Sequence, residues 1–328
     1  MQRRKFITLL GGAAAAWPLA ARAQLQPSGK VWRIGMLETT SEALNAGNMA
    51  AFQQSLRSMG YVERQNYTIE YRSADGRSER FAPLAAELLR LGADIIVARG
   101  TPATLAARNA SATVPIVMTS TAEPFAIVTS IARPGGNVTG LSSMISDLAS
   151  KRLELLSDLL PRLERVAVMY DGRNPTTSST NRTIETTAQA LKIEAKKFDV
   201  RKPEDFRPAF VAARSEHVDA IMMDNETITQ ANRQLVAELA AEHRLPVIYA
   251  SKEFVDAGGL IALGVSYQDL YRRAAIYVDK IFKGAKPADL PIEHPDQRQY
   301  VSSRRGPRPP LHLVRSRCPM RKPRTAPL

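Results

Sequence analysis

The chain has very little of the chemistry that disulfide frameworks and metal centres need. Its 328 residues include one cysteine, Cys318, and four histidines. A single cysteine excludes a disulfide bond within the chain. The histidines are scattered, and none pairs with Cys, Asp or Glu at the spacing of a metal site: they are His217, His243, His294 and His312. We therefore expect no metal and no cofactor.

The local patterns of common enzyme and nucleotide sites are also missing. The sequence contains neither a G-x-S-x-G nucleophile elbow nor a P-loop. The glycine-rich segment 135–140 lacks the spacing of a dinucleotide-binding loop, and we interpret it as a tight turn. Since no base or nucleophile with a partner is visible, we expect a protein without catalytic activity.

Acidic residues are absent from both ends of the chain. The formal net charge is +13, but residues 1–24 carry four basic residues and no acid, and residues 298–328 carry nine basic residues and no acid. Residues 25–297 are therefore formally neutral. A neutral body offers no electrostatic basis for binding nucleic acid or an anionic membrane, and we expect neither as a partner.

The first 23 residues have the pattern of an export signal. Arg3 and Arg4 precede an apolar run over 6–19, and Ala21 and Ala23 give the small-x-small pattern of a signal-peptidase site. The paired arginines favour twin-arginine export, while the general secretory route stays open. The apolar run is too short to cross a bilayer of usual thickness. We therefore expect cleavage near Ala23 and a periplasmic protein.

Short apolar segments alternate with longer amphipathic segments through the body of the chain, and this alternation predicts parallel sheets. The predicted strands are 31–37, 67–72, 94–98, 115–118, 165–170, 193–198, 220–223, 247–249 and 260–264. The predicted helices are 46–59, 80–91, 102–109, 148–160, 176–191, 203–215, 228–243 and 268–282.

These elements form two consecutive modules of similar size. We therefore predict an α/β fold with two Rossmann-like lobes, each with a parallel sheet, joined by a hinge. Lobe 1 is expected over 30–143 plus about 266–290, and lobe 2 over 144–265. Ligands of open α/β sheets bind beyond the carboxyl ends of the strands, so we expect a ligand in the cleft between the lobes.

Polar residues follow the predicted strands on both sides of this cleft. The free amide groups of a helix that begins at Pro102 suit a carboxylate. Each polar residue has an alternative role as a helix cap or turn residue. The candidate ligand-binding residues are Thr39, Thr40, Gly100, Thr101, Ser120, Thr121, Glu123, Tyr170, Asn174, Asp224, Asn225 and Tyr249.

Several segments match a known family when they are taken together. They include LAAELLRLGADIIVARGTPATLAA at 84–107, RPGGNVTGLS at 133–142, DAIMMDNE at 219–226 and LPVIYASKEFVDAGGLIALGVSYQDLYRRAA at 245–275. The chain resembles the periplasmic substrate-binding proteins of ABC transporters, in the family whose members bind aromatic amino acids such as tryptophan. The resemblance covers roughly 30–295 and implies a type I periplasmic binding protein.

This resemblance implies a solute-binding component of an ABC importer. Its lobes would close on a small organic solute, an amino acid or aromatic compound, and deliver it to a membrane permease that has a separate ATPase subunit. Asp224 matches the acid of the family's DN step and is expected to meet a ligand cation. Thr101 and Thr121 are expected at an anionic end, and Tyr170 and Tyr249 are candidates for stacking on a flat ligand. We expect a monomer.

The C-terminal segment departs from the family pattern. Residues 296–328 are rich in proline and arginine and have no hydrophobic period. A frameshift near residue 296 and a native basic tail are both open, and we expect this tail to form no packed element.

Three alternatives to import remain open: a sensor that presents its solute to a receptor kinase, a periplasmic enzyme, and a remnant inactivated by its altered C-terminus.

Overall fold

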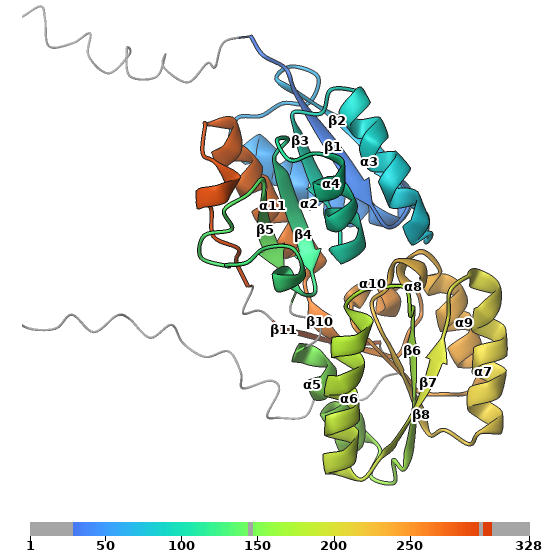
Figure 1. Ribbon diagram of the computed structural model, residues 1–328. Coiled ribbons are helices and arrows are strands. Elements are labelled where there is room, and N and C mark those ends of the chain that lie inside the picture. The colour runs from blue at the N-terminus through green and yellow to red at the C-terminus, as the bar shows by residue number, and fades with distance from the viewer. Residues whose placement is uncertain (1–28, 144–146, 295–297, 304–328) are drawn as a thin grey trace, which may run out of the picture.

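The computed structural model describes residues 29–143, 147–294 and 298–303. They form two α/β lobes that lie end to end (Figure 1). The predicted signal peptide, residues 1–23, and most of the basic tail lie outside the described residues. The predicted fold class is confirmed, because each lobe is built on a sheet of mostly parallel strands.

Lobe 1 contains a parallel sheet of five strands in the order β2-β1-β3-β4-β5. Its strands are β1 (Trp32–Glu38), β2 (Tyr67–Ser73), β3 (Ile95–Ala98), β4 (Ile116–Thr121) and β5 (Val138–Ser142). The helices around it are α2 (Glu42–Ser58), α3 (Phe81–Arg90), α4 (Thr101–Ala110) and α11 (Tyr267–Phe282). Because helices cover both faces, β3 and β4 are buried along their whole length.

Lobe 2 contains a sheet of six strands in the order β11-β10-β9-β8-β6-β7. Its strands are β6 (Arg165–Tyr170), β7 (Glu194–Asp199), β8 (Ala220–Met223), β9 (Val247–Tyr249), β10 (Ile261–Val265) and β11 (Arg298–Ser302). Its helices are α5 (Asp147–Leu159), α6 (Thr177–Leu191), α7 (Phe206–Ser215), α8 (Thr227–Ala231), α9 (Arg233–His243) and α10 (Lys252–Asp256). All of these strands except β11 run parallel.

The two sheets share one topology. In each, the first strand of the lobe lies inside the sheet and the chain then builds outward on both sides of it. The strand order therefore reverses between β1 and β3 in lobe 1 and between β6 and β8 in lobe 2. Such a switch point separates the loops at the carboxyl ends of two neighbouring strands and creates a crevice for a ligand.

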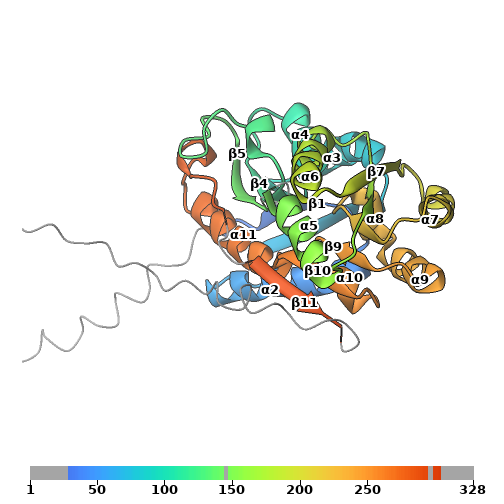
Figure 2. The ribbon, with the colours of Figure 1, turned by 90° about the horizontal axis from the view of Figure 1, so that it is seen from below.

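The chain crosses between the lobes three times: after Ser143, between Val265 and Tyr267, and between His294 and Arg298. After the second crossing, α11 packs beside α2, as both ribbon views show (Figures 1 and 2). Its inward face, including Leu270 and Tyr271, joins the same hydrophobic core as β1. The two lobes are therefore joined by three stretches of chain, two of which include residues outside the described ranges.

The structure corrects three details of the predicted elements. Segment 135–140 was interpreted as a tight turn, but its residues 138–140 belong to strand β5, which runs from Val138 to Ser142. The helix predicted over 228–243 is two helices, α8 and α9, that meet at Asn232. The segment after residue 295 was expected to form no packed element, but residues 298–302 form β11, which pairs antiparallel with β10.

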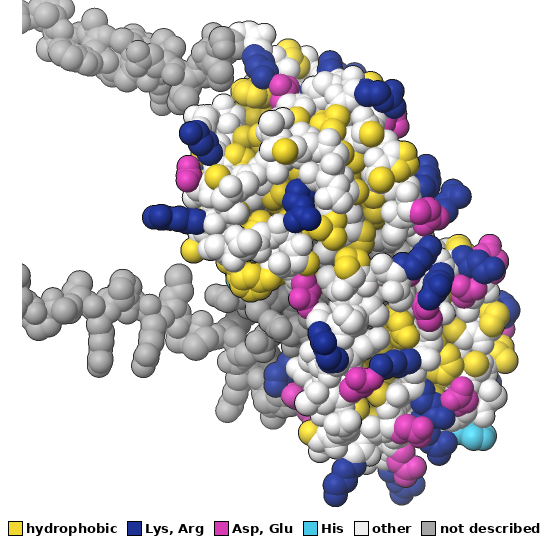
Figure 3. Space-filling view, viewed as in Figure 1, with side chains coloured by type: hydrophobic (Ala, Val, Ile, Leu, Met, Phe, Trp, Pro, Cys, Tyr) yellow, Lys and Arg dark blue, Asp and Glu magenta, His cyan; other side chains and the backbone are white. Residues whose placement is uncertain are grey.

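Charge of both signs is interspersed over the surface of the described residues, as the space-filling view shows for one face (Figure 3). This arrangement agrees with the neutral body of the sequence. No helix among the described residues is long and apolar enough to cross a membrane.

Candidate functional site

A polar cavity of about 40 Å³ lies between the lobes, where the strand ends of the two sheets face each other. Its wall includes residues from the loops after β1, β3, β4 and β5 in lobe 1 and after β6 and β8 in lobe 2, with α8 and α11 completing it. Both switch points therefore open into it. The residues around this cleft cavity are Thr39, Arg99, Gly100, Thr101, Pro102, Ser120, Ala122, Ser143, Asn174, Asn225, Glu226, Thr227, Gln230 and Tyr267.

The lobe 1 wall carries a buried cation. Arg99 follows β3 directly and is 2% exposed. Its Nη1 donates to Asn45 Oδ1 at 3.0 Å, and its guanidinium lies 4.5 Å from the centre of the Tyr267 ring. Across the lobe boundary its Nη2 reaches Gln230 Oε1 at 3.5 Å and Glu253 Oε1 at 3.9 Å. Arg99 thus joins the two lobes and gives the wall positive charge.

Helix α4 adds to this positive wall. It begins at Thr101, immediately after Gly100, with Pro102 in its first turn. The first amide groups of a helix have no partner within the helix, and its dipole favours an anion there. Thr101 Oγ1 accepts a hydrogen bond from the Ala122 amide at 3.3 Å, which fixes the helix start against the loop after β4.

The lobe 2 wall carries a buried carboxyl group. Glu226, 3% exposed, accepts hydrogen bonds from Asn174 Nδ2 and from Thr177 Oγ1. Burial and the neighbouring Asp224 carboxylate raise the pKa of Glu226 well above its usual range. Asp224 itself lies 3.7 Å from Arg152 Nη2 of α5, and both of these side chains are buried.

Three side chains close the cavity between the walls. Asn225 Nδ2 donates to the Tyr267 hydroxyl, and Gln230 Nε2 donates to Asn225 Oδ1. Gln230 also donates to Ser251 Oγ at 3.0 Å. Because Tyr267 begins α11 directly after the second crossing, this chain of hydrogen bonds connects that crossing to the loops after β8 and β9 of lobe 2.

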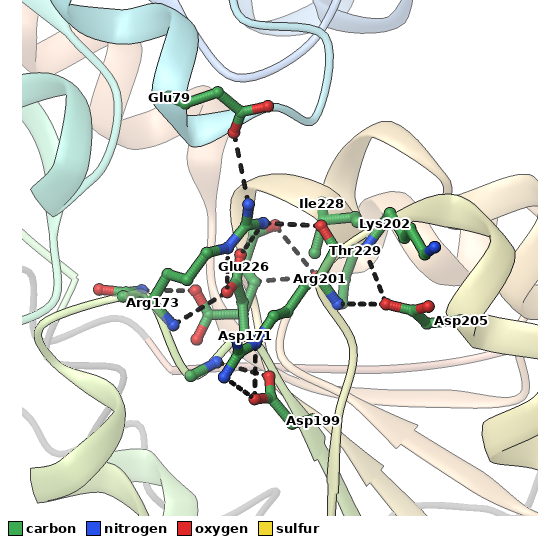
Figure 4. Close-up of polar contacts among 12 residues, drawn as sticks. Glu79, Asp171, Arg173, Asp199, Arg201, Lys202, Asp205, Glu226, Ile228 and Thr229 are labelled. Carbon is green, nitrogen blue, oxygen red and sulfur yellow. Dashed lines mark hydrogen bonds and ion pairs between the residues drawn. The ribbon is translucent and has the colours of Figure 1, made fainter.

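Ion pairs and hydrogen bonds outside the cavity also bridge the lobes. Arg173 of lobe 2 reaches Glu79 of lobe 1 at 3.4 Å, while two nitrogens of the same guanidinium hold Asp171 at 2.7 and 2.9 Å (Figure 4). On another side of the cleft Ser179 donates to Glu123. The described residues therefore show lobes in direct contact around the cavity.

Six of the predicted ligand-binding residues do line the cavity. They come from the ends of five different strands that the topology brings together, β1, β3, β4, β6 and β8: Thr39, Gly100, Thr101, Ser120, Asn174 and Asn225. The rule that ligands lie beyond strand ends therefore located much of the cavity wall.

The structure places the other six predicted residues behind or beside the wall. Thr40 and Thr121 are fully buried in lobe 1, and Glu123 makes the contact with Ser179. Asp224 lies behind Asn225 and Glu226 and faces Arg152. None of the four lines the cavity.

The two tyrosines predicted to stack on a ligand do not lie in the cavity, and that expectation is corrected. Tyr249 is fully buried in lobe 2, where its ring stacks on Phe254 at a centroid distance of 4.7 Å. Tyr170 packs against the core under α5 and α6, on the opposite side of the sheet from Tyr249. Tyr267, which was not predicted, is the aromatic side chain of the cavity wall.

Sequence reasoning also missed Arg99, Ser143, Glu226 and Gln230 as cavity residues. Arg99 carried a usable signal, because it is a charged residue directly after a buried apolar strand. Gln230 carried none, since it lies inside α8 and not directly after a strand. No cluster of His, Cys, Asp and Glu that could hold a metal occurs among the residues described.

Comparison with known families identifies the class of protein. The family model described as "ABC transporter substrate binding protein" matches residues 40–304. The chain belongs to this family, and the resemblance seen in the sequence is confirmed at that level. A curated relative, the tyrosine-binding protein of Clostridioides difficile (strain R20291), is 24% identical over 252 residues, which cover 76% of this chain and 72% of the relative.

Solved structures show the same fold. A conserved domain protein from Vibrio cholerae matches with a TM-score of 0.76 at 23% identity, and a Streptococcus pneumonia ABC domain in complex with L-Trp matches with 0.75 at 22%. A ligand-free, open substrate-binding protein with adhesive properties from Clostridium difficile gives 0.59 at 23%. In each case the match covers 83% of this chain and 92% of the other.

Proposed function

We propose that this protein is the exported solute-binding component of an ABC importer and that its solute is an amino acid. In this proposal the chain acts in the periplasm as a monomer without catalytic activity. Its lobes close on the solute, and the closed form delivers it to a membrane permease with a separate ATPase subunit. The family assignment supports the transporter role, and the names of the relatives favour an aromatic amino acid.

The observation that carries the amino-acid assignment is the opposite chemistry of the two cavity walls. Arg99 and the first amides of α4 favour a carboxylate on lobe 1, whereas Glu226 offers a carboxyl group on lobe 2. A zwitterion that spans the cavity would satisfy both walls at once. It would therefore hold the lobes together, which is the differential affinity that closure requires.

One comparison supports closure around the solute, and the size of the cavity limits what the described arrangement can hold. The structure is more similar to the tryptophan complex than to the ligand-free, open relative, although sequence identity and coverage are nearly the same. A cavity of about 40 Å³ has room for water but not for an amino acid. Both entry and binding of the solute therefore require the lobes to lie further apart than in the described structure.

Thermal unfolding in the presence of a panel of amino acids tests the proposal. A solute that binds only the folded state raises the free energy of unfolding by about 2.7 kcal/mol at a hundredfold excess over its dissociation constant. We expect a shift with one or a few amino acids. An unchanged transition with every amino acid would reject the proposed solute class.

A pair of isosteric variants locates the site. Thr101→Val removes a hydroxyl from the cavity wall and should reduce the shift. Thr183→Val removes a hydroxyl that donates to Ser179 O within α6 and should leave it unchanged. Equal shifts in both variants would place the solute elsewhere.

A further inference from the structure

The two acidic residues at the end of β8 have different electrostatic surroundings. Asp224 lies 3.7 Å from the buried guanidinium of Arg152 and does not line the cavity. Glu226, two residues later, lines the cavity. Among the described residues it makes no ion pair within 4 Å, and its side chain accepts hydrogen bonds from two neutral groups, of Asn174 and Thr177.

Other charged groups around the cavity already have hydrogen-bond or ion-pair partners. Asp171 at the end of β6 is held by Arg173, which also reaches Glu79. Arg99, at the end of β3, contacts Asn45, Gln230 and Glu253. Thus the cavity wall contains one buried carboxyl group that lacks a cation, while the neighbouring acids have theirs.

We propose that Glu226 is the residue that selects a ligand with a protonated amine, and that it exchanges its own proton for that amine when the ligand binds. This inference rests on the proposed function, because it assumes that an amino acid occupies the cavity. A buried carboxylate without a cation is unfavourable, so Glu226 is the neutral acid when the lobes are together and the cavity is empty. An incoming ammonium group supplies the missing charge, and the carboxyl proton passes to solvent.

The electrostatics of the site agree with this exchange. Burial and the carboxylates of Asp224 and Asp171 raise the pKa of Glu226, while the hydrogen bonds from Asn174 and Thr177 oppose the shift. Bound ammonium lowers the pKa again, because an opposite charge favours the ionised form. Ligand binding therefore releases a proton, and affinity rises with pH until Glu226 is ionised in the empty site as well.

Calorimetric titration with two probes tests the inference. L-tyrosine carries both charged groups, and 3-(4-hydroxyphenyl)propanoate lacks only the amine. At pH 6 we expect the wild type to bind tyrosine more tightly and to release a proton, detected as a binding heat that depends on the ionisation enthalpy of the buffer. The propanoate should bind more weakly without proton release.

Two variants assign the effect to this residue. Glu226→Gln keeps the size of the side chain and an oxygen for Asn174 and Thr177. It should weaken tyrosine binding by about tenfold or more, as expected for a lost charge-assisted hydrogen bond, and abolish proton release. Glu242→Gln removes an exposed carboxylate that pairs with Arg207 and should change neither quantity.

The possible outcomes separate the inference from the function on which it rests. Equal affinity of the wild type for both probes, or tyrosine binding without proton release, would overturn the role of Glu226 and leave an amino-acid-binding protein. Binding of neither probe would count against the proposed aromatic ligand and would overturn the inference with it. Proton release by the wild type requires no variant, so a folding defect in Glu226→Gln cannot obscure the result.

Discussion

Two buried tyrosine hydroxyl groups show how differently single residues serve this fold. Tyr271 donates to Glu38 at 2.6 and 2.7 Å inside lobe 1. The Tyr249 hydroxyl is buried in lobe 2 without a hydrogen-bond partner, and its ring stacks on Phe254. The first hydroxyl therefore stabilises a buried polar group, whereas the second carries a desolvation cost.

Substitution of each tyrosine by phenylalanine should separate these roles. Tyr249→Phe removes an unsatisfied group and should change the free energy of unfolding by between zero and a gain of about 1 kcal/mol. Tyr271→Phe leaves Glu38 without its donor and should cost about 1–3 kcal/mol. Urea unfolding measures both. A clear loss of stability or of ligand affinity in Tyr249→Phe would contradict its placement in the core.

Glu38 should make stability depend on pH. Burial raises its pKa to about 7, against the opposing effects of Arg99 and the Tyr271 hydrogen bond. The folded state therefore binds a proton more tightly than the unfolded chain, in which the pKa is near 4.5. The contribution of Glu38 to the free energy of unfolding is greatest below pH 4.5, falls as the pH rises to about 7, and then stays constant.

Glu38→Gln should remove this dependence, because the amide stays neutral and still accepts the Tyr271 hydrogen bond. Relative to the wild type, the variant should gain roughly 3 kcal/mol between pH 4.5 and pH 8. Urea unfolding at the two pH values measures the change. The same difference between the two proteins at both pH values would show that Glu38 does not titrate as described.

The candidate site was only partly predictable at the level of residues. Gly100, Thr101 and Asn225 follow strands in the sequence, and the general position of ligands in α/β folds was enough to find them. Tyr249 also lies at the carboxyl end of a strand, but its side chain packs in the core of lobe 2. Successive side chains of a strand point to opposite faces of the sheet, so the position at a strand end does not by itself determine which face a side chain occupies. Gln230 reaches the cavity through tertiary packing, which no local pattern encodes.

At the scale of elements, the sequence predicted the strands with long apolar runs and missed β5 and β11. Strand β5 contains Gly140 at a φ of 125°, where a Cβ atom would lie 2.2 Å from Met118 O. Glycine allows this close approach of β5 to β4, yet it weakens the strand signal. Strand β11 lacks an apolar run, so its sequence carries no strand signal. It forms by antiparallel hydrogen bonding with β10.

Two C-terminal truncations should reveal what β11 contributes. A chain that ends after Ser303 keeps β11 and should unfold like the full-length protein. A chain that ends after Pro295 loses the ladder on β10 and the packing of Tyr300 against lobe 2. It should be less stable and more prone to aggregate, since it exposes a sheet edge. Thermal unfolding and light scattering measure the difference, and equal behaviour would show that β11 is dispensable.

At the scale of the whole molecule, the lobes meet closely at Gly76. This residue has a φ of 82°, and a Cβ atom added to it would lie 2.9 Å from the Ala231 Cβ of lobe 2. Gly60 has a similar φ of 92°, but a Cβ atom there would meet nothing within 4 Å. Alanine substitutions at these two glycines therefore distinguish the cost of backbone strain, which both share, from the cost of contact between the lobes, which only Gly76 has.

Gly76→Ala should weaken closure, and Gly60→Ala should not. Both carry the cost of a left-handed alanine, but only the first is overpacked when the lobes are together. Overpacking costs roughly 1–3 kcal/mol, so the affinity of Gly76→Ala for its solute should fall about tenfold. Titration calorimetry measures the affinities. Equal affinities in the two variants would contradict the observed approach of the lobes.

The central claim is that one amino acid binds in the cleft cavity between the lobes. Equilibrium dialysis of the purified protein against radiolabelled tyrosine or tryptophan tests this claim most directly. The account predicts saturable binding that approaches one molecule per chain and weakens in Gln230→Ala, which removes a bridge between the cavity walls. Absence of saturable binding for every amino acid, with the protein folded, would contradict it.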